Sequence, residues 1–90
     1  MSQIKKQNIE NKRKKLIFRS GHRGTKEMDL IMESFALAHV PQFSEAELAD
    51  YEALLNESDP DLYNWITLKE NAPPQIAELG VFQKLLQNYT

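Results

Sequence analysis

Apolar residues in this chain recur every three or four positions, which is the spacing of one face of an α-helix. The clearest stretch starts after residue 27, and its apolar positions are Met28, Ile31, Met32, Phe35 and Ala38. Pro41 stops this run, because the residue before a proline disfavours the helical conformation. We therefore predict a helix that ends near His39.

Two further helices flank this one. The polar segment from Asn8 to Arg19 is rich in helix formers, and Gly21 can end it in the left-handed cap conformation. Ser44 and Glu47 have the spacing of a capping box, in which each side chain accepts a hydrogen bond from the other residue's backbone. The helix that they start has one apolar face and ends near Asn56; the face consists of Leu48, Tyr51, Leu54 and Leu55.

The C-terminal third predicts two more helices. Asp59 is a suitable N-cap, Pro60 fits the first helical position, and Asp61 meets the positive end of the helix dipole. This short helix is expected to bury Leu62 and one or both of Trp65 and Ile66. The two prolines at 73 and 74 break the chain and start the fifth helix, with apolar positions Ile76, Leu79, Phe82, Leu85, Leu86 and Tyr89.

These elements predict an all-α fold, a compact five-helix bundle in a single small domain. The 90 residues are 41% apolar and 27% charged, which is ordinary for a globular chain, and strand-like alternation never persists. We expect the domain to cover residues 12–90 and to follow a basic N-terminal segment, residues 1–11, that frays. The free protein is expected to be a monomer.

Composition excludes several kinds of site and favours one kind of compartment. Without cysteine there are no disulfides, thiol nucleophiles or cysteine metal ligands. No apolar run approaches the roughly 18 residues of a membrane span, and no signal peptide is visible. We therefore expect a soluble, cytoplasmic bacterial protein without membrane insertion. A mitochondrial transit peptide is the alternative, because the first residues are basic, but they are rich in Lys and Asn and contain Glu10.

Charge is distributed unevenly along the chain. Residues 1–28 carry nine Lys or Arg and two Glu, whereas residues 29–90 carry two Lys and eleven acids. The basic segment has three interpretations: a solvated helix, a surface for phosphates of nucleic acid, or a surface for an acidic protein partner. Phe18 is the sole aromatic residue among the first 34, and the acidic remainder would repel phosphate, so a protein partner is favoured over nucleic acid.

Catalytic and metal-binding patterns are absent from the sequence. His22 and His39 are not paired with each other or with cysteine at a metal-ligand spacing, and no nucleophile elbow occurs. The segment GHRG lacks the GxGxxG spacing of a dinucleotide-binding loop. We therefore expect a protein that is not an enzyme and holds no metal.

The stretch GHRGTKEMD, residues 21–29, is the best candidate for a binding site. Arg23 and Glu27 are four residues apart, so a simple helical ion pair is one explanation. Gly24 lies between them and would weaken a helix by roughly 1 kcal/mol relative to alanine. A glycine there suits close approach of a partner's backbone, with the arginine offering a forked set of donors.

Two segments of this chain resemble one known family. Residues 23–27, RGTKE, resemble the RGxxE signature of the bacterial SdhE and mitochondrial succinate dehydrogenase assembly factor 2 family, and Asp29 extends the match. Residues 59–65, DPDLYNW, resemble that family's second segment. The resemblance covers roughly residues 12–88 and rests on both segments together.

The resemblance implies a five-helix factor that binds the flavoprotein subunit of succinate dehydrogenase, and in some bacteria of fumarate reductase. Such a factor promotes covalent attachment of FAD to a histidine of that client, so FAD belongs to the client and no cofactor is bound stably by the factor. The expected partner-binding residues are Arg19, His22, Arg23, Gly24, Glu27 and Asp29. His22 departs from the family, where many members have Arg or Lys. The alternative function is a small nucleic-acid-binding protein that uses the basic N-terminal helix.

Overall fold

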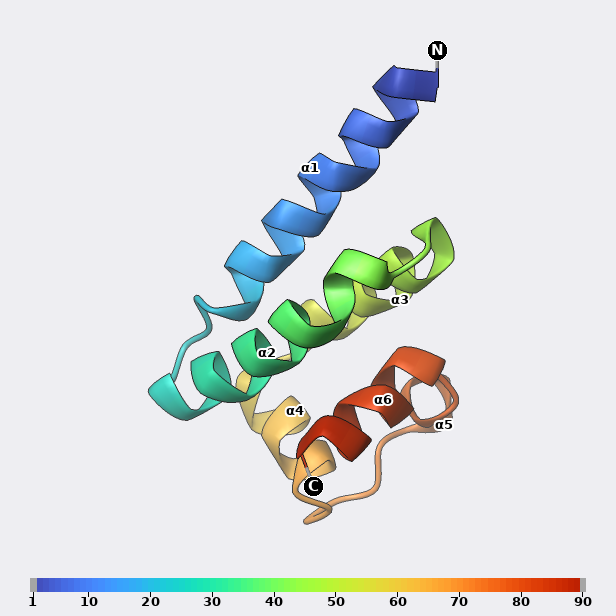
Figure 1. Ribbon diagram of the computed structural model, residues 1–90. Coiled ribbons are helices and arrows are strands. Elements are labelled where there is room, and N and C mark those ends of the chain that lie inside the picture. Colours follow the sequence, from blue (N-terminus) through green and yellow to red (C-terminus); the bar gives the residue numbers. More distant parts are fainter. Residues whose placement is uncertain (1, 90) are drawn as a thin grey trace.

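Helices make up nearly all of the regular structure. The computed structural model describes residues 2–89, with backbone alone for residues 2–6. Over this range the chain forms six α-helices, one 3₁₀ helix and no strand, which confirms the all-α bundle (Figure 1). The elements are α1 (Ser2–Ser20), α2 (Lys26–His39), η1 (Val40–Gln42), α3 (Glu45–Leu55), α4 (Asp59–Ile66), α5 (Pro74–Ala77) and α6 (Gly80–Tyr89).

Side-chain caps set the starts of the three central helices. Thr25 caps α2 by accepting from the Met28 N–H at 3.2 Å. Ser44 and Glu47 form the predicted capping box at α3, where the hydrogen bond from the Ser44 backbone lowers the pKa of Glu47. At α4 the N-cap is Ser58, one residue before the predicted Asp59. The shift has a clear cause, because the Asp59 carboxylate is held by another part of the chain.

Two further helix boundaries differ from the predictions. Helix α1 begins at Ser2 rather than near Asn8, and residues 1 and 90 lie outside the described range. The predicted fifth helix is divided into α5 and α6, with the short break at residues 78 and 79. Gly80 follows this break, and glycine lowers the stability of a continuous helix because its backbone loses more freedom on folding. The separation of residues 1–11 from the rest of the domain stays a prediction.

The core lies where α2, α3, α4 and α6 meet. Phe35, Phe43 and Tyr51 pack ring to ring at 5.6–6.0 Å between centroids. Trp65 and Ile66 are both buried, with exposed fractions of 7% and 1%, so both contribute to the core.

Helix α1 packs against this core by one side only. Leu16 is buried and Ile17 is partly buried, whereas most of the helix is polar and its N-terminal part extends beyond the other helices (Figure 1). Although α1 is the longest helix, neither it nor any other helix within residues 2–89 is long and apolar enough to cross a membrane.

A buried pair of hydroxyl groups fixes the end of α1 on α3. Ser20 Oγ donates to the Leu16 carbonyl at 2.7 Å, which uses its single proton. The Tyr51 hydroxyl, 2.6 Å away, is therefore the donor to Ser20. Burial raises the pKa of Tyr51 to about 12, because a phenolate would be poorly solvated there. This contact holds the last residue of α1 against α3, directly before the loop that follows.

Candidate functional site

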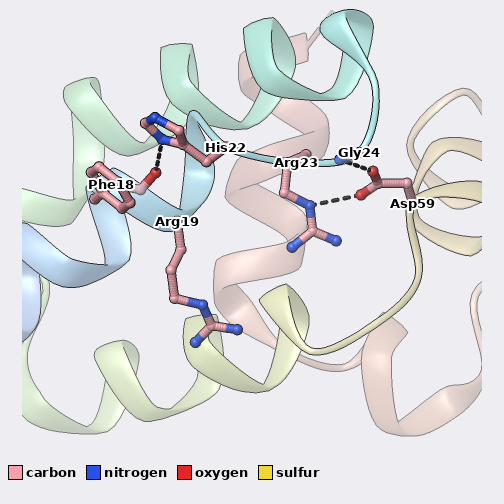
Figure 2. A pocket seen from close by; sticks show the side chains of 6 residues that line it. All are labelled: Phe18, Arg19, His22, Arg23, Gly24 and Asp59. Atoms are coloured by element: carbon pink, nitrogen blue, oxygen red, sulfur yellow. Dashed lines mark hydrogen bonds and ion pairs between the residues drawn. The ribbon is translucent and has the colours of Figure 1, made fainter.

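The loop of residues 21–25, between α1 and α2, lies against the connection between α3 and α4. Arg23 makes the link (Figure 2). Its Nε donates to Asp59 Oδ1 at 2.7 Å. Its two terminal nitrogens donate to the backbone carbonyls of Leu55 and Glu57 at 2.6 and 2.8 Å. The side chains of Arg23 and Asp59 are only 10% and 14% exposed, so this ion pair is largely interior.

Gly24 lies beside the same carboxylate. Its N–H donates to Asp59 Oδ2 at 2.6 Å, so one carboxylate binds two consecutive residues of the loop (Figure 2). A Cβ added at Gly24 would lie 2.9 Å from Oδ2, closer than atoms tolerate without a shift. Gly24 does not have a positive φ. Close approach of the chain's own Asp59 is therefore enough to explain why a glycine suits this position.

Asp29 completes the bracing of the loop. It lies in the first turn of α2, and its carboxylate accepts from the Arg23 backbone N–H. A carboxylate is also favourable there because the helix dipole is positive at its N-terminus. Arg23 is thus held at its backbone by α2 and at its side chain by the connection after α3. We name Arg23, Gly24, Asp29 and Asp59 the loop brace.

Glu27 differs from the loop brace because its side chain is exposed. Glu27 raises the pKa of Tyr63, first because hydrogen bonding to its carboxylate favours the protonated phenol, and second because losing the proton would place two negative charges together. The two residues border an open depression of about 250 Å³. Its lining residues are Thr25, Glu27, Met28, Asp59, Pro60 and Tyr63.

Arg19 and His22 lie on the other side of the loop, at the end of α1. Arg19 donates to Asn56 Oδ1 at 2.9 Å and approaches Glu52 at 3.8 Å. The His22 ring stacks on Phe18, with centroids 4.0 Å apart, and its Nδ1 lies 2.7 Å from the Phe18 carbonyl oxygen (Figure 2). Together with Arg23, Gly24 and Asp59, these residues line an open depression of about 460 Å³.

The six residues expected from the sequence therefore gather around one loop, but they are not equivalent. Arg23 pairs with Asp59 rather than with Glu27, and its donors point into the protein. Sequence reasoning missed Asp59 and Tyr63 as parts of the site. The signal was present, since both lie in the DPDLYNW segment that accompanied the first motif. Whether these residues bind a partner stays a prediction.

The polar side chains at this loop supply both donors and acceptors for recognition of polar groups. Glu27 and His22 are exposed, and the guanidinium of Arg19 and the phenol of Tyr63 are partly exposed. Within residues 2–89, no group of three or more His, Cys, Asp or Glu side chains is arranged to hold a metal ion.

Comparison with known proteins places this arrangement in a family. A family model described as flavinator of succinate dehydrogenase matches residues 14–89, which is most of the chain. This chain belongs to the succinate dehydrogenase flavinator family. The match includes the loop brace, Glu27 and Tyr63, so the resemblance noted from the two sequence segments is confirmed.

Curated relatives of this flavinator family member carry the name succinate dehydrogenase assembly factor 2, mitochondrial. The protein from Dictyostelium discoideum is 42% identical over 81 residues, covering 90% of this chain and 56% of the relative. The protein from Candida glabrata is 41% identical over 86 residues, covering 93% of this chain and 56% of the relative. The protein from Saccharomyces cerevisiae strain YJM789 is 40% identical over 76 residues, covering 82% of this chain and 47% of the relative. The chain thus spans about half the length of the curated relatives it matches.

These relatives contradict the predicted location. The expectation of a bacterial cytoplasmic protein is wrong, because the matched assembly factors come from eukaryotes and are named mitochondrial. The expectation rested on the missing apolar leader and the missing cysteine. A missing apolar leader does not separate the two compartments, because mitochondrial transit peptides are amphipathic rather than apolar.

Proposed function

We propose that this protein binds the flavoprotein subunit of succinate dehydrogenase and promotes the covalent attachment of FAD to it. The family and the names of the relatives support an assembly role. In this proposal the FAD and the catalytic groups belong to the client, and the factor acts as a chaperone without catalytic residues of its own. The names of the same relatives support a mitochondrial location.

The observation that carries the proposal is an exposed carboxylate beside a braced loop. Arg23, Gly24 and Asp59 hold residues 21–25 in one conformation, so little freedom is lost when a partner docks. Glu27 lies at the start of α2, directly after this loop, and remains exposed. The loop brace therefore presents Glu27, and the neighbouring depression gives a partner's side chain a place to enter.

This arrangement explains how a small protein can favour a bond that it does not make. A rigid surface that binds one conformation of the client more tightly raises the population of that conformation. If that conformation brings the client's histidine and the flavin together, bond formation accelerates in proportion. The factor needs shape and charge for this task but no nucleophile or general base.

A reconstitution experiment tests the proposal. The apo flavoprotein subunit is incubated with FAD, with and without an equimolar amount of this protein, and is then denatured and separated by electrophoresis. Fluorescence retained on the denatured subunit reports covalent flavin. We expect the protein to accelerate its appearance and to retain no FAD itself after dialysis. Equal rates with and without the protein would contradict the proposal.

A further inference from the structure

The outward side of α1 carries cationic residues around an exposed phenylalanine. Phe18 is 63% exposed, which is unusual for an aromatic ring in a small domain with a well-filled core. The cationic residues are Lys14 and Lys15, about one turn before it, and Arg19, directly after it; the imidazole of His22 lies just past the end of α1. We name these five residues the α1 strip.

The α1 strip is one continuous surface. Lys14, Lys15, Phe18 and Arg19 border an open depression of about 490 Å³. Phe18 and Arg19 also border the depression beside the loop brace, which Arg23 and Gly24 line from the other side. Figure 2 shows Phe18 and His22 stacked at this junction. The strip therefore runs without a break into the loop that presents Glu27.

Charges on the α1 strip are mostly uncompensated. Lys14 and Lys15 are exposed and form no ion pair with any residue in the described part of the chain. Arg19 is partly balanced, because it approaches Glu52 at 3.8 Å. The basic residues inside the bundle, by contrast, are matched, as Arg23 is by Asp59. The strip thus offers free positive charge beside apolar surface.

We propose that the α1 strip is a second contact surface and binds a short acidic segment of the flavoprotein partner, with Phe18 receiving an apolar side chain. This inference rests on the proposed function. Within α1 the strip runs from Lys14 to Arg19, which is about 8 Å along the helix axis and accommodates about two residues of an extended segment, and His22 extends it past the end of the helix. Carboxylates complement Lys14 and Lys15, and a rigid exposed ring is a typical interface anchor.

Acidic protein fits this surface better than nucleic acid does. Residues 29–90 carry eleven acids and two lysines, so a strand of phosphates longer than the strip would meet repulsive charge. Glu52 lies at its edge, against Arg19. Phe18 is also the sole strongly exposed aromatic residue on α1 within the described side chains, whereas strands of bases usually need several stacking platforms.

The test measures affinity of three variants for the isolated flavoprotein subunit, at low and high salt. Phe18→Ala is expected to weaken binding at least about fivefold. The double variant Lys14→Gln/Lys15→Gln is expected to weaken it about three- to tenfold at low salt, with the difference disappearing at high salt. Asn71→Asp/Gln75→Glu is the matched control, because it changes net charge equally at exposed positions away from α1. The control is expected to bind like the wild type.

The possible outcomes separate the two proposals. Failure of the wild-type protein to bind the subunit contradicts the proposed function itself. Tight wild-type binding with unchanged Phe18→Ala and double-lysine variants overturns the α1 strip alone. The double-lysine variant could also lose affinity for a generic single-stranded oligonucleotide while keeping its affinity for the subunit. That result would overturn the proposal and indicate that the α1 strip binds nucleic acid. All variants should melt like the wild type, because the changed side chains are exposed.

Discussion

Arg19 and Arg23 lie four residues apart at the junction of α1 and the loop, yet they occupy opposite environments. The Arg19 side chain is 39% exposed, with one hydrogen bond to Asn56 and a 3.8 Å approach to Glu52. Arg23 is 10% exposed and donates three hydrogen bonds to the segment between Leu55 and Asp59. An arginine of a binding motif can therefore be part of the internal structure while a nearby arginine lies at the surface.

The largest difference should appear when the two arginines are removed. Arg23→Ala removes the cation that pairs with Asp59 and the donor to two backbone carbonyls, so we expect it to lower the free energy of unfolding by about 3 kcal/mol. Arg19→Ala should cost less than about 1 kcal/mol because exposed pairs contribute little. Urea unfolding of both variants measures this. Equal small losses would show that Arg23 is not a brace.

The buried side of α1 is held by Tyr51 of α3, which contacts Ser20, and this contact should make stability depend on pH. The Tyr51 pKa of about 12 in the folded protein lies above the ordinary value near 10, so the folded state holds the proton more tightly than the unfolded state. Stability from this group is present below pH 10 and is lost as pH rises toward 12. The loss should be on the order of 2–3 kcal/mol.

The variant Tyr51→Phe isolates this effect. Lysines also titrate at alkaline pH, so the informative quantity is the difference in unfolding free energy between wild type and variant across pH 9–12. The stability of the wild type relative to the variant should fall as pH rises through this range, because only the wild type has a buried phenol that becomes ionised. A difference that stays constant with pH would contradict the assignment.

Gly24 and Gly80 should differ in how an added methyl group affects stability. Gly24→Ala pushes a methyl group toward the Asp59 carboxylate, which Arg23 holds in place, so we expect a loss of about 1–2 kcal/mol. Gly80→Ala is the control, because nothing lies within 4 Å of the added Cβ and the residue is helical. It should be neutral or stabilising by up to about 1 kcal/mol. Thermal melts of the two variants measure the difference. Equal melting temperatures would contradict the explanation that Gly24 is needed because Asp59 lies so close to it.

Local chemistry explains which parts of the fold could be predicted. The apolar spacing from Met28 to Ala38, the stop at Pro41 and the capping box at Ser44 depend on neighbours within a few residues. The break after Ala77 was missed because apolar spacing continues across it. The N-cap of α4 was displaced by one residue because Asp59 is used by Arg23, 36 positions away. A contact between residues so far apart in the sequence cannot be predicted from local patterns.

The site shows the same limit. The position of the site was predictable, since all six expected residues lie around the loop of residues 21–25. The different roles of these residues could not be predicted, because Arg23 and Glu27 are both charged residues in one short motif. Only the tertiary contacts reveal that Arg23 faces Asp59 while Glu27 faces solvent and Tyr63.

In the proposed function Glu27 contacts the partner while the loop brace holds it in position. The decisive measurement is covalent flavin formation on the flavoprotein subunit with Glu27→Gln, compared with Glu45→Gln. Both residues are exposed carboxylates in the first turn of a helix, so both changes should alter melting by less than about 2 °C. We predict that Glu27→Gln slows flavin attachment at least about tenfold, whereas Glu45→Gln matches the wild type. Equal rates for the two variants would contradict the account.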